Sequence, residues 1–241
     1  PSTNDELADI LQKTQAELVI TLASGRLIKT SELQIPKHGW LNVHFSLLPR
    51  WRGAAPVQRA IAAGDEQSGV TVFKLEQGLD TGPIYSTLSY PLNDRSRSDE
   101  VLKDLSSLCI QPVNQALIMI AAGEPASRQE TEGVTLAPKI LKSEGRIDWN
   151  RDSKMLDRQI RAFQPWPGAY TSFNGTRIEI IEARVSDADG AAGEVISLNP
   201  LLVGTGSGSL EIIRVKPENK REMSSSDWLR GARIILPCFF E

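Results

Sequence analysis

Residues 40–56 constrain the fold of this chain more than any other stretch of its sequence. Apolar and polar residues alternate at the start of the stretch, so a strand would place Leu41 and Val43 on one face. Asn42 and His44 would share the opposite face. A loop punctuated by proline and glycine follows at once. The sequence therefore predicts a strand that ends where it delivers two polar side chains.

Apolar runs on either side of this strand indicate an α/β domain. Residues 18–22 form a run typical of a strand buried on both faces of a parallel sheet, and residues 69–75 predict a further strand. Residues 54–63 predict a helix, and an earlier helix would begin at Thr3, with Glu6 completing a capping box. Strands that alternate with helices favour a doubly wound, Rossmann-like domain with a parallel sheet.

A second loop places a carboxylate near the same edge of the predicted sheet. Asp80 lies between Gly78 and Gly82, shortly after the strand 69–75. Ligands of such sheets bind beyond the carboxyl ends of the strands, where both His44 and Asp80 fall. An amide, an imidazole and a carboxylate together can hold a developing oxyanion and move a proton. Taken singly, each residue more often has a structural role, in a turn or at the end of a strand.

The pattern changes in the second half of the chain. Residues 99–122 predict a long helix, which Pro112 should kink or divide because proline has no backbone N–H. Polar and small residues then indicate a linker, and a helix over 152–163 opens a second domain. Short strands are predicted over residues 170–173, 177–183, 193–198, 201–204 and 210–215, the first two joined by an Asn174-Gly175 turn. Such strands suggest a small barrel.

Composition narrows the class of protein. The 241 residues are 40% hydrophobic and 24% charged, as in an ordinary globular protein of one or two domains. We expect no membrane-spanning stretch and no secretory signal. Cys109 and Cys238 lack metal-ligand spacing and suit a reducing cytosol, with a disulfide between them as the alternative. No phosphate loop, dinucleotide fingerprint or zinc spacing occurs, so no metal is expected.

A nucleic-acid surface would have to come from clustered charges, because the net charge is −3. The candidate clusters are Arg146, Arg151, Lys154, Arg158 and Arg161, then Lys216, Lys220 and Arg221, then Arg230 and Arg233. The alternative for any single one of these residues is a solvated surface charge.

Three ordered motifs resemble the methionyl-tRNA formyltransferase family: LNVHFSLLPRWRGAAPVQRAI (41–61), GVTVFKLEQGLDTG (69–82) and IRAFQPWPGAYT (160–171). The resemblance runs from about residue 16 to the end of the chain, so we expect the opening strands of the family's first domain to be missing. It implies a truncated catalytic domain over 1–123, a linker over 124–143, and an OB-like tRNA-binding domain over 144–241.

The resemblance also implies roles for individual residues. Asn42, His44 and Asp80 would be the catalytic trio. The folate side of the site would comprise Ser46, Leu47, Leu48, Pro49, Gly78 and Leu79. Candidate nucleic-acid contacts would be Arg50, Lys216, Lys220 and Arg221. The sequence departs from the family at Phe45, where a small residue or proline is usual, and at Ser24, where tyrosine is usual. We expect a packing change at Phe45, because its side chain should face away from the site.

The implied reaction is formyl transfer from 10-formyltetrahydrofolate, as co-substrate, to the amino group of initiator methionyl-tRNA, without a metal. Asn42 and His44 would hold the formyl oxygen, and Asp80 would position His44 and help move a proton through water. The implied protein is a monomer, away from membranes, in a bacterial cytoplasm, with an organelle matrix left open. The alternatives are a folate-dependent formyltransferase acting on an amino sugar nucleotide, and a non-catalytic RNA-binding protein.

Overall fold

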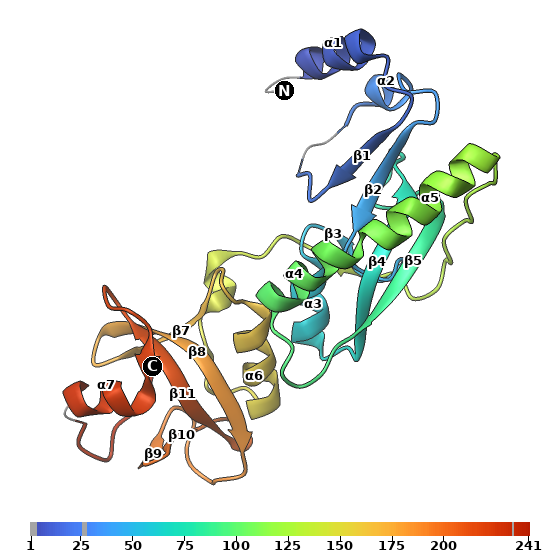
Figure 1. Cartoon of the computed structure of the whole chain (residues 1–241). Coiled ribbons are helices and arrows are strands. Elements are labelled where there is room, and N and C mark those ends of the chain that lie inside the picture. Colours follow the sequence, from blue (N-terminus) through green and yellow to red (C-terminus); the bar gives the residue numbers. More distant parts are fainter. Residues whose placement is uncertain (1–3, 26–27, 233) are drawn as a thin grey trace. The chain divides into compact units, whose positions relative to one another are not determined.

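The computed structural model describes residues 4–25, 28–232 and 234–241. Thr3 of the predicted capping box and the candidate Arg233 lie outside these residues. The chain divides into two compact units: residues 1–60, 66–92 and 101–139 form one, and residues 61–65, 93–100 and 140–241 form the other. Each unit has a sheet of its own (Figure 1).

The sheet of the first unit is mixed rather than parallel throughout. Its strands are β1 (Val19–Leu22), β2 (Trp40–His44), β4 (Gln67–Lys74) and β5 (Ile84–Pro91), in the order β1-β2-β4-β5. Only β1 and β2 are parallel among these described strands, while β4 is antiparallel to both of its neighbours. The loop from β4 to β5 is too short for the crossover that a parallel pair needs. The Rossmann-like α/β class is confirmed, and the sheet is mixed where the sequence indicated a parallel one.

Strand β1 is not buried on both faces as its apolar run predicted. Ile20 is 42% exposed and Leu22 is 47% exposed, and these exposed positions alternate with the half-buried Val19 and Thr21. Among the described strands, β1 pairs with β2 alone. A strand covered on one face only leaves alternate side chains in contact with solvent.

The helices before residue 123 belong wholly or mostly to the first unit. The described ones are α1 (Asn4–Thr14), α2 (Thr30–Leu33), α3 (Pro56–Ala63), α4 (Ser98–Leu108) and α5 (Ile110–Ala122). The predicted division of the long helix is confirmed, and it falls at Cys109. Pro112 has no N–H to donate to the carbonyl of Leu108, the last residue of α4. Helix α5 packs on β4 and β5 (Figure 1).

The stretch Ser98–Ala122, formed by α4 and α5, is long and apolar enough to cross a membrane by length and composition alone. This differs from the expectation that the chain contains no such stretch. Because α5 contacts the sheet through β4 and β5, we interpret it as a helix that covers the sheet.

The end of the first unit lies in the region where the sequence indicated a linker. Strand β6 (Leu136–Ala137) pairs in parallel with β3 (Arg52–Gly53), the short strand that precedes α3. Ser127 forms an antiparallel bridge with Ile84. Backbone hydrogen bonds therefore hold this polar segment against the loop that follows β2.

The second unit contains η1 (Lys142–Gly145), α6 (Ser153–Ala162), β7 (Ala169–Phe173), β8 (Thr176–Ser186), β9 (Val195–Leu198), β10 (Leu201–Gly204), β11 (Ser209–Pro217), β12 (Met223–Ser224) and α7 (Ser225–Ala232). The sheet order is β7-β8-β11-β10-β9, and β12 pairs with β11. The predicted hairpin is confirmed, with Asn174 at φ 49° and Gly175 at φ 72°. The sequence did not predict β12 and α7.

The C-terminal tail joins the two edges of this sheet. The N–H of Val195 donates to the carbonyl of Cys238, and the N–H of Phe240 donates to that of Gly193. On the other side, Glu241 and Ser172 exchange two backbone hydrogen bonds. The tail thus lies between β9 and β7 and gives the closure that a small barrel requires. Both Cys109 and Cys238 are free thiols in the described structure.

Candidate active site

The end of β2 and the loop between β4 and β5 bring an imidazole and a carboxylate together. His44 is the last residue of β2, and its Nδ1 lies 3.8 Å from Oδ2 of Asp80. Both side chains are shielded from water, with exposed fractions of 5% for His44 and 13% for Asp80. Asn42 lies two residues earlier on the same face of β2. All three predicted catalytic residues therefore lie in the first unit.

A backbone carbonyl fixes the orientation of the His44 ring. Its Nε2 lies 2.8 Å from the carbonyl oxygen of Trp51, which can only accept, so Nε2 carries the hydrogen. In the neutral ring Nδ1 is then the acceptor, on the side of Asp80. Burial lowers the pKa of His44, and this effect outweighs Asp80 and the Trp51 carbonyl, which raise it. The structure thus holds a neutral imidazole with a basic Nδ1.

The loop that carries Asp80 has a tightly determined shape. Asp80 adopts φ 50°, in the left-handed region, and its Oδ2 accepts a hydrogen bond of 2.7 Å from the N–H of Gly53. A Cβ on Gly82 would lie 1.7 Å from the carbonyl oxygen of Lys74, so only glycine allows this close approach. The glycines that flank Asp80 in the sequence were a signal for such a loop.

Thr21 orients the amide of Asn42. Its Oγ1 lies 2.9 Å from Oδ1 of Asn42 and 3.1 Å from the carbonyl oxygen of Leu41. The hydroxyl therefore occupies the acceptor side of the amide and leaves Nδ2 as the donor. The parallel register of β1 and β2 pairs Thr21 with Asn42. Sequence reasoning missed Thr21, because the register of two strands cannot be read from either strand alone.

The predicted folate residues divide into buried and accessible ones. Ser46 is 1% exposed, and its hydroxyl donates to the carbonyl of Arg50 at 2.6 Å. Leu48 is also buried and donates its N–H to Oγ1 of Thr71. These side chains shape the loop around the Leu48–Pro49 cis bond. The side chains of Leu47 and Leu79 remain at least partly accessible, as does Gly78.

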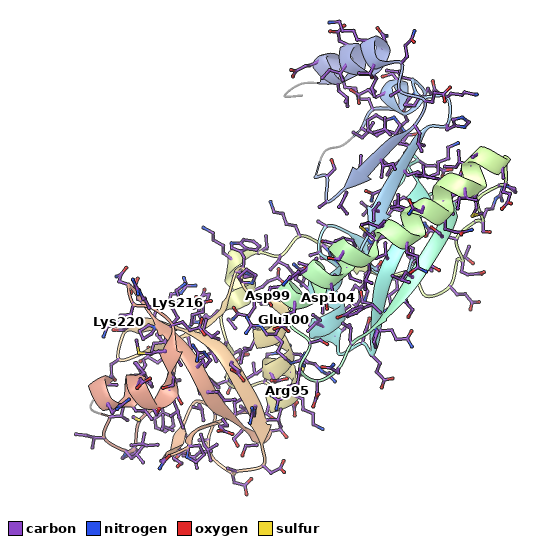
Figure 2. All side chains as sticks on the ribbon, in the orientation of Figure 1. Arg95, Asp99, Glu100, Asp104, Lys216 and Lys220 are labelled. Atoms are coloured by element: carbon purple, nitrogen blue, oxygen red, sulfur yellow. The ribbon has the colours of Figure 1, made fainter. Side chains whose placement is uncertain are left out.

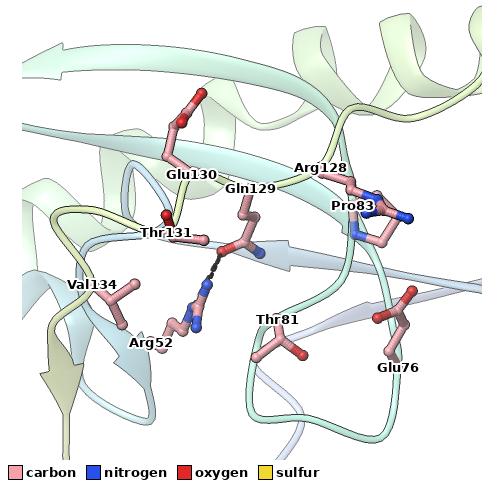
Figure 3. Close-up of a pocket in the computed structure, with 9 residues that line it drawn as sticks. All are labelled: Arg52, Glu76, Thr81, Pro83, Arg128, Gln129, Glu130, Thr131 and Val134. Carbon is pink, nitrogen blue, oxygen red and sulfur yellow. Dashed lines mark hydrogen bonds between the residues drawn. The ribbon is translucent and has the colours of Figure 1, made fainter.

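Residues 124–143, which the sequence predicts as a linker, contribute side chains to the surroundings of the site that no local sequence pattern indicates. Oγ1 of Thr135 accepts from the N–H of Trp51, whose carbonyl holds His44. Gln129 contacts both Arg52 and the Asp80 loop. Gln129 also lines a hollow of about 570 Å³ beside this loop (Figure 3). The described lining comprises Arg52, Glu76, Thr81, Pro83, Arg128, Gln129, Glu130, Thr131 and Val134, and none of the predicted trio.

The candidate nucleic-acid residues differ in how far their charge is compensated. The guanidinium of Arg50 lies over the Trp51 ring, 4.5 Å from the ring centroid. Nζ of Lys216 lies 3.7 Å from a Glu179 oxygen, whereas Lys220 is exposed in the turn after β11 (Figure 2). Arg221 is exposed beside it. Elsewhere, Arg161 pairs with Asp157 and Arg230 with Asp227. No cluster of three potential metal ligands occurs among the described residues.

Comparison with known proteins places these features in a family. The family model described as "Formyl transferase" matches residues 2–108, and "Formyl transferase, C-terminal domain" matches residues 139–233. A methionyl-tRNA formyltransferase of Cutibacterium acnes is 40% identical over 236 residues, which cover 94% of this chain and 75% of that protein. The chain thus spans about three quarters of this relative.

Solved structures share the fold at lower identity. HypX from Aquifex aeolicus in complex with tetrahydrofolic acid has a TM-score of 0.72 at 20% identity, covering 94% of this chain and 41% of that one. A methionyl-tRNA formyltransferase from Clostridium thermocellum has a TM-score of 0.62 at 19% identity, covering 78% of this chain and 81% of that one. At these identities the likeness concerns the fold.

Proposed function

Because the chain belongs to the methionyl-tRNA formyltransferase family, we propose that Asn42, His44 and Asp80 are its catalytic residues. The enzyme transfers the formyl group of 10-formyltetrahydrofolate to the amino group of methionyl-tRNA. The observation that carries the proposed roles is the pair of contacts made by His44, whose Nε2 is held by the Trp51 carbonyl while Nδ1 lies 3.8 Å from Asp80.

The residues present fit the co-substrate. The accessible side chain of Leu79 and the partly exposed Leu47 offer apolar surface to a folate ring. The Nδ2 of Asn42, on the other side of the amide from the Thr21 hydroxyl, offers a donor to a formyl oxygen. The folate supplies an activated formyl group, and the folate nitrogen that carried this group is the leaving group. We assign folate binding to Leu47, Leu79 and Gly78. Ser46, Leu48 and Pro49 would instead shape the loop that follows β2.

In the proposed mechanism Asn42 holds the charge that develops on the formyl oxygen. Its Nδ2 donates to this oxygen as the carbon becomes tetrahedral, an effect worth about 3 kcal/mol for one donor in comparable sites. Neutral His44 has no hydrogen on Nδ1, so it cannot donate from that side before it takes up a proton. This proposal departs from the expectation that Asn42 and His44 together hold the formyl oxygen.

His44 instead acts first as a base. Nδ1 receives the proton that the attacking amine loses, directly or through water. Asp80 stabilises the resulting imidazolium, which then has an Nδ1–H to give to the departing nitrogen. Because burial keeps the ring neutral, the base is ready at neutral pH. Asp80 itself is held in place by the N–H of Gly53.

We further propose that the N-terminal and C-terminal parts of the chain bind different substrates. Residues 1–123 would hold the folate and the reacting groups, with 124–143 as the connecting segment and residues 144–241 as the tRNA-binding domain. Exposed Lys220 and Arg221 support this assignment, with Arg50 as a candidate contact near the reacting groups. The proposed protein is a monomeric bacterial cytoplasmic enzyme, and its proposed tRNA is the charged initiator. An amino sugar nucleotide is the rival acceptor, which no contact of the site favours.

The test is steady-state formylation of charged initiator tRNA by Asn42→Ala and His44→Ala variants. Each should lower kcat at least about a hundredfold while folate affinity is largely kept, because both residues act on charge that appears in the transition state. His38→Ala and Asn150→Ala are matched controls at positions away from the trio. Wild-type turnover in either site variant would remove that residue from the mechanism.

A further inference from the structure

The side chain of Gln129 connects the two backbone segments that meet at the Asp80 carboxylate. Its Oε1 accepts hydrogen bonds from Nε and Nη2 of Arg52, at 3.2 and 2.7 Å (Figure 3). Its Nε2 donates to the carbonyl oxygens of Asp80 and Gly82, both at 2.8 Å. Every hydrogen-bonding group of this amide is therefore used within the first unit.

These contacts admit one orientation of the amide and no other side-chain chemistry. A guanidinium can only donate and backbone carbonyls can only accept, so Oε1 must face Arg52 and Nε2 must face the Asp80 loop. A carboxylate at this position would keep the Arg52 contact but oppose two carbonyl oxygens. An apolar side chain of the same length would lose all four hydrogen bonds.

Gln129 acts on both sides of the Asp80 carboxylate. Arg52 directly precedes Gly53, whose N–H donates to Asp80 Oδ2. Asp80 and Gly82 are the residues whose carbonyls Gln129 holds, and Asp80 has the left-handed φ of 50° that non-glycine residues seldom adopt. The amide thus holds the backbone of the Asp80 loop directly and ties it to the side chain that neighbours the Gly53 donor.

We propose that Gln129 is a positioning residue for formyl transfer, which sets the Asp80 carboxylate against Nδ1 of His44. The inference rests on the proposed function of that pair. Gln129 itself touches neither His44 nor the reacting atoms among the described contacts. It acts through Asp80, whose charge raises the pKa of His44 against the effect of burial. Displacing a catalytic group by about 1 Å can cost a hundredfold in rate.

The experiment compares Gln129→Met and Gln129→Glu with Arg128→Ala, a control at an exposed neighbour that lines the same hollow. Both Gln129 variants should lower kcat about tenfold or more, with the KM for 10-formyltetrahydrofolate within about twofold. Arg128→Ala should keep the wild-type kcat. Wild-type kcat in Gln129→Glu would show that Arg52 is the only partner that matters and would overturn the proposal.

A titration of the His44 ring by NMR separates positioning from mere stability. In Gln129→Met the pKa of His44 should fall below the wild-type value, because a displaced Asp80 no longer raises it as strongly. If Gln129 had a structural role alone, its replacement would lower the melting temperature but leave this pKa and the kcat of the folded enzyme unchanged. That outcome would contradict the proposal. Asp80→Asn is measured in parallel. If Asp80→Asn keeps wild-type turnover the proposed mechanism fails, while the titration still decides whether Gln129 positions Asp80.

Discussion

At the scale of single residues, the protonation state of His44 decides which group can start the reaction. Burial is the largest influence on the pKa of this ring and lowers it below its ordinary value of 6.5. Asp80 and the Trp51 carbonyl act in the opposite direction. The ring is consequently neutral at neutral pH, where it can accept the proton of an attacking amine.

We predict that His44 titrates below pH 6.5 and that Asp80→Asn lowers its pKa further, because this variant removes a charge that favours the imidazolium. As the pH falls, the unfolded state takes up a proton near pH 6.5, whereas the folded state does so only at a lower pH. The contribution of His44 to the free energy of unfolding is therefore fully present above pH 6.5. It is lost as the pH falls through the lowered folded value. The acid limb of kcat/KM should lie below pH 6.5 as well. The two histidines are assigned in NMR titrations with His38→Gln, and a His44 titration at or above 6.5 would contradict the prediction.

The residues that could be predicted are those whose signal is local. Alternation along one strand gave the shared face of Asn42 and His44, and flanking glycines marked Asp80. Thr21 reaches Asn42 through the register of two strands, and Gln129 reaches the Asp80 loop across about fifty residues of chain. No local sequence pattern predicts either contact. Their partners are groups of the backbone or of another strand.

At the scale of elements, the loop from β4 to β5 sets the geometry of the site. The N–H of Lys74 donates to the carbonyl of Pro83, which closes the loop at its base. Gly82 lies inside this closure, against the Lys74 carbonyl. The same short connection makes β5 antiparallel to β4, so the loop also determines the sheet topology.

We predict that Gly82→Ala displaces the Asp80 loop, because its Cβ would meet backbone that cannot move aside. The variant should lose about 1–3 kcal/mol of unfolding free energy in urea denaturation and at least about tenfold in kcat. Gly25→Ala is the matched control, since a Cβ there meets nothing within 4 Å. Equal stability and turnover in both variants would show that the loop can relax without consequence.

The elements themselves were predicted unevenly. The β2 strand and the Asn174-Gly175 hairpin have strong alternation and turn signals, and both are found. Strand β5 carries serines and threonine among its apolar residues, which weakened its pattern. The segment that contains β6 is mostly polar, so its sequence does not predict the pairing with β3, which rests on backbone hydrogen bonds between two distant segments.

At the scale of the whole molecule, charge on the C-terminal sheet is balanced across strands. The register of β8 and β11 sets Lys216 opposite Glu179 and Arg214 opposite Glu182. A phosphate that approaches these pairs meets an acid beside each base. Attraction to a nucleic acid must therefore come from basic residues beyond the paired ladder, such as Lys220 and Arg221 in the exposed turn.

We therefore predict that the affinity for charged initiator tRNA falls steeply with salt, while folate affinity, which involves no comparable set of phosphates, changes little. Replacing Lys220 and Arg221 by glutamine should reduce the log–log salt slope by roughly 2 and leave the chemical rate at saturation unchanged. Adding Lys216→Gln should reduce the slope by less than either of the others, because Glu179 already compensates its charge.

Lys29→Gln with Lys37→Gln, both exposed in the first unit, is the control for a general loss of positive charge. A full set of affinities measured by filter binding between low and physiological salt decides the question. Weak tRNA binding at low salt, together with efficient formylation of an amino sugar nucleotide, would replace tRNA by that sugar as the acceptor.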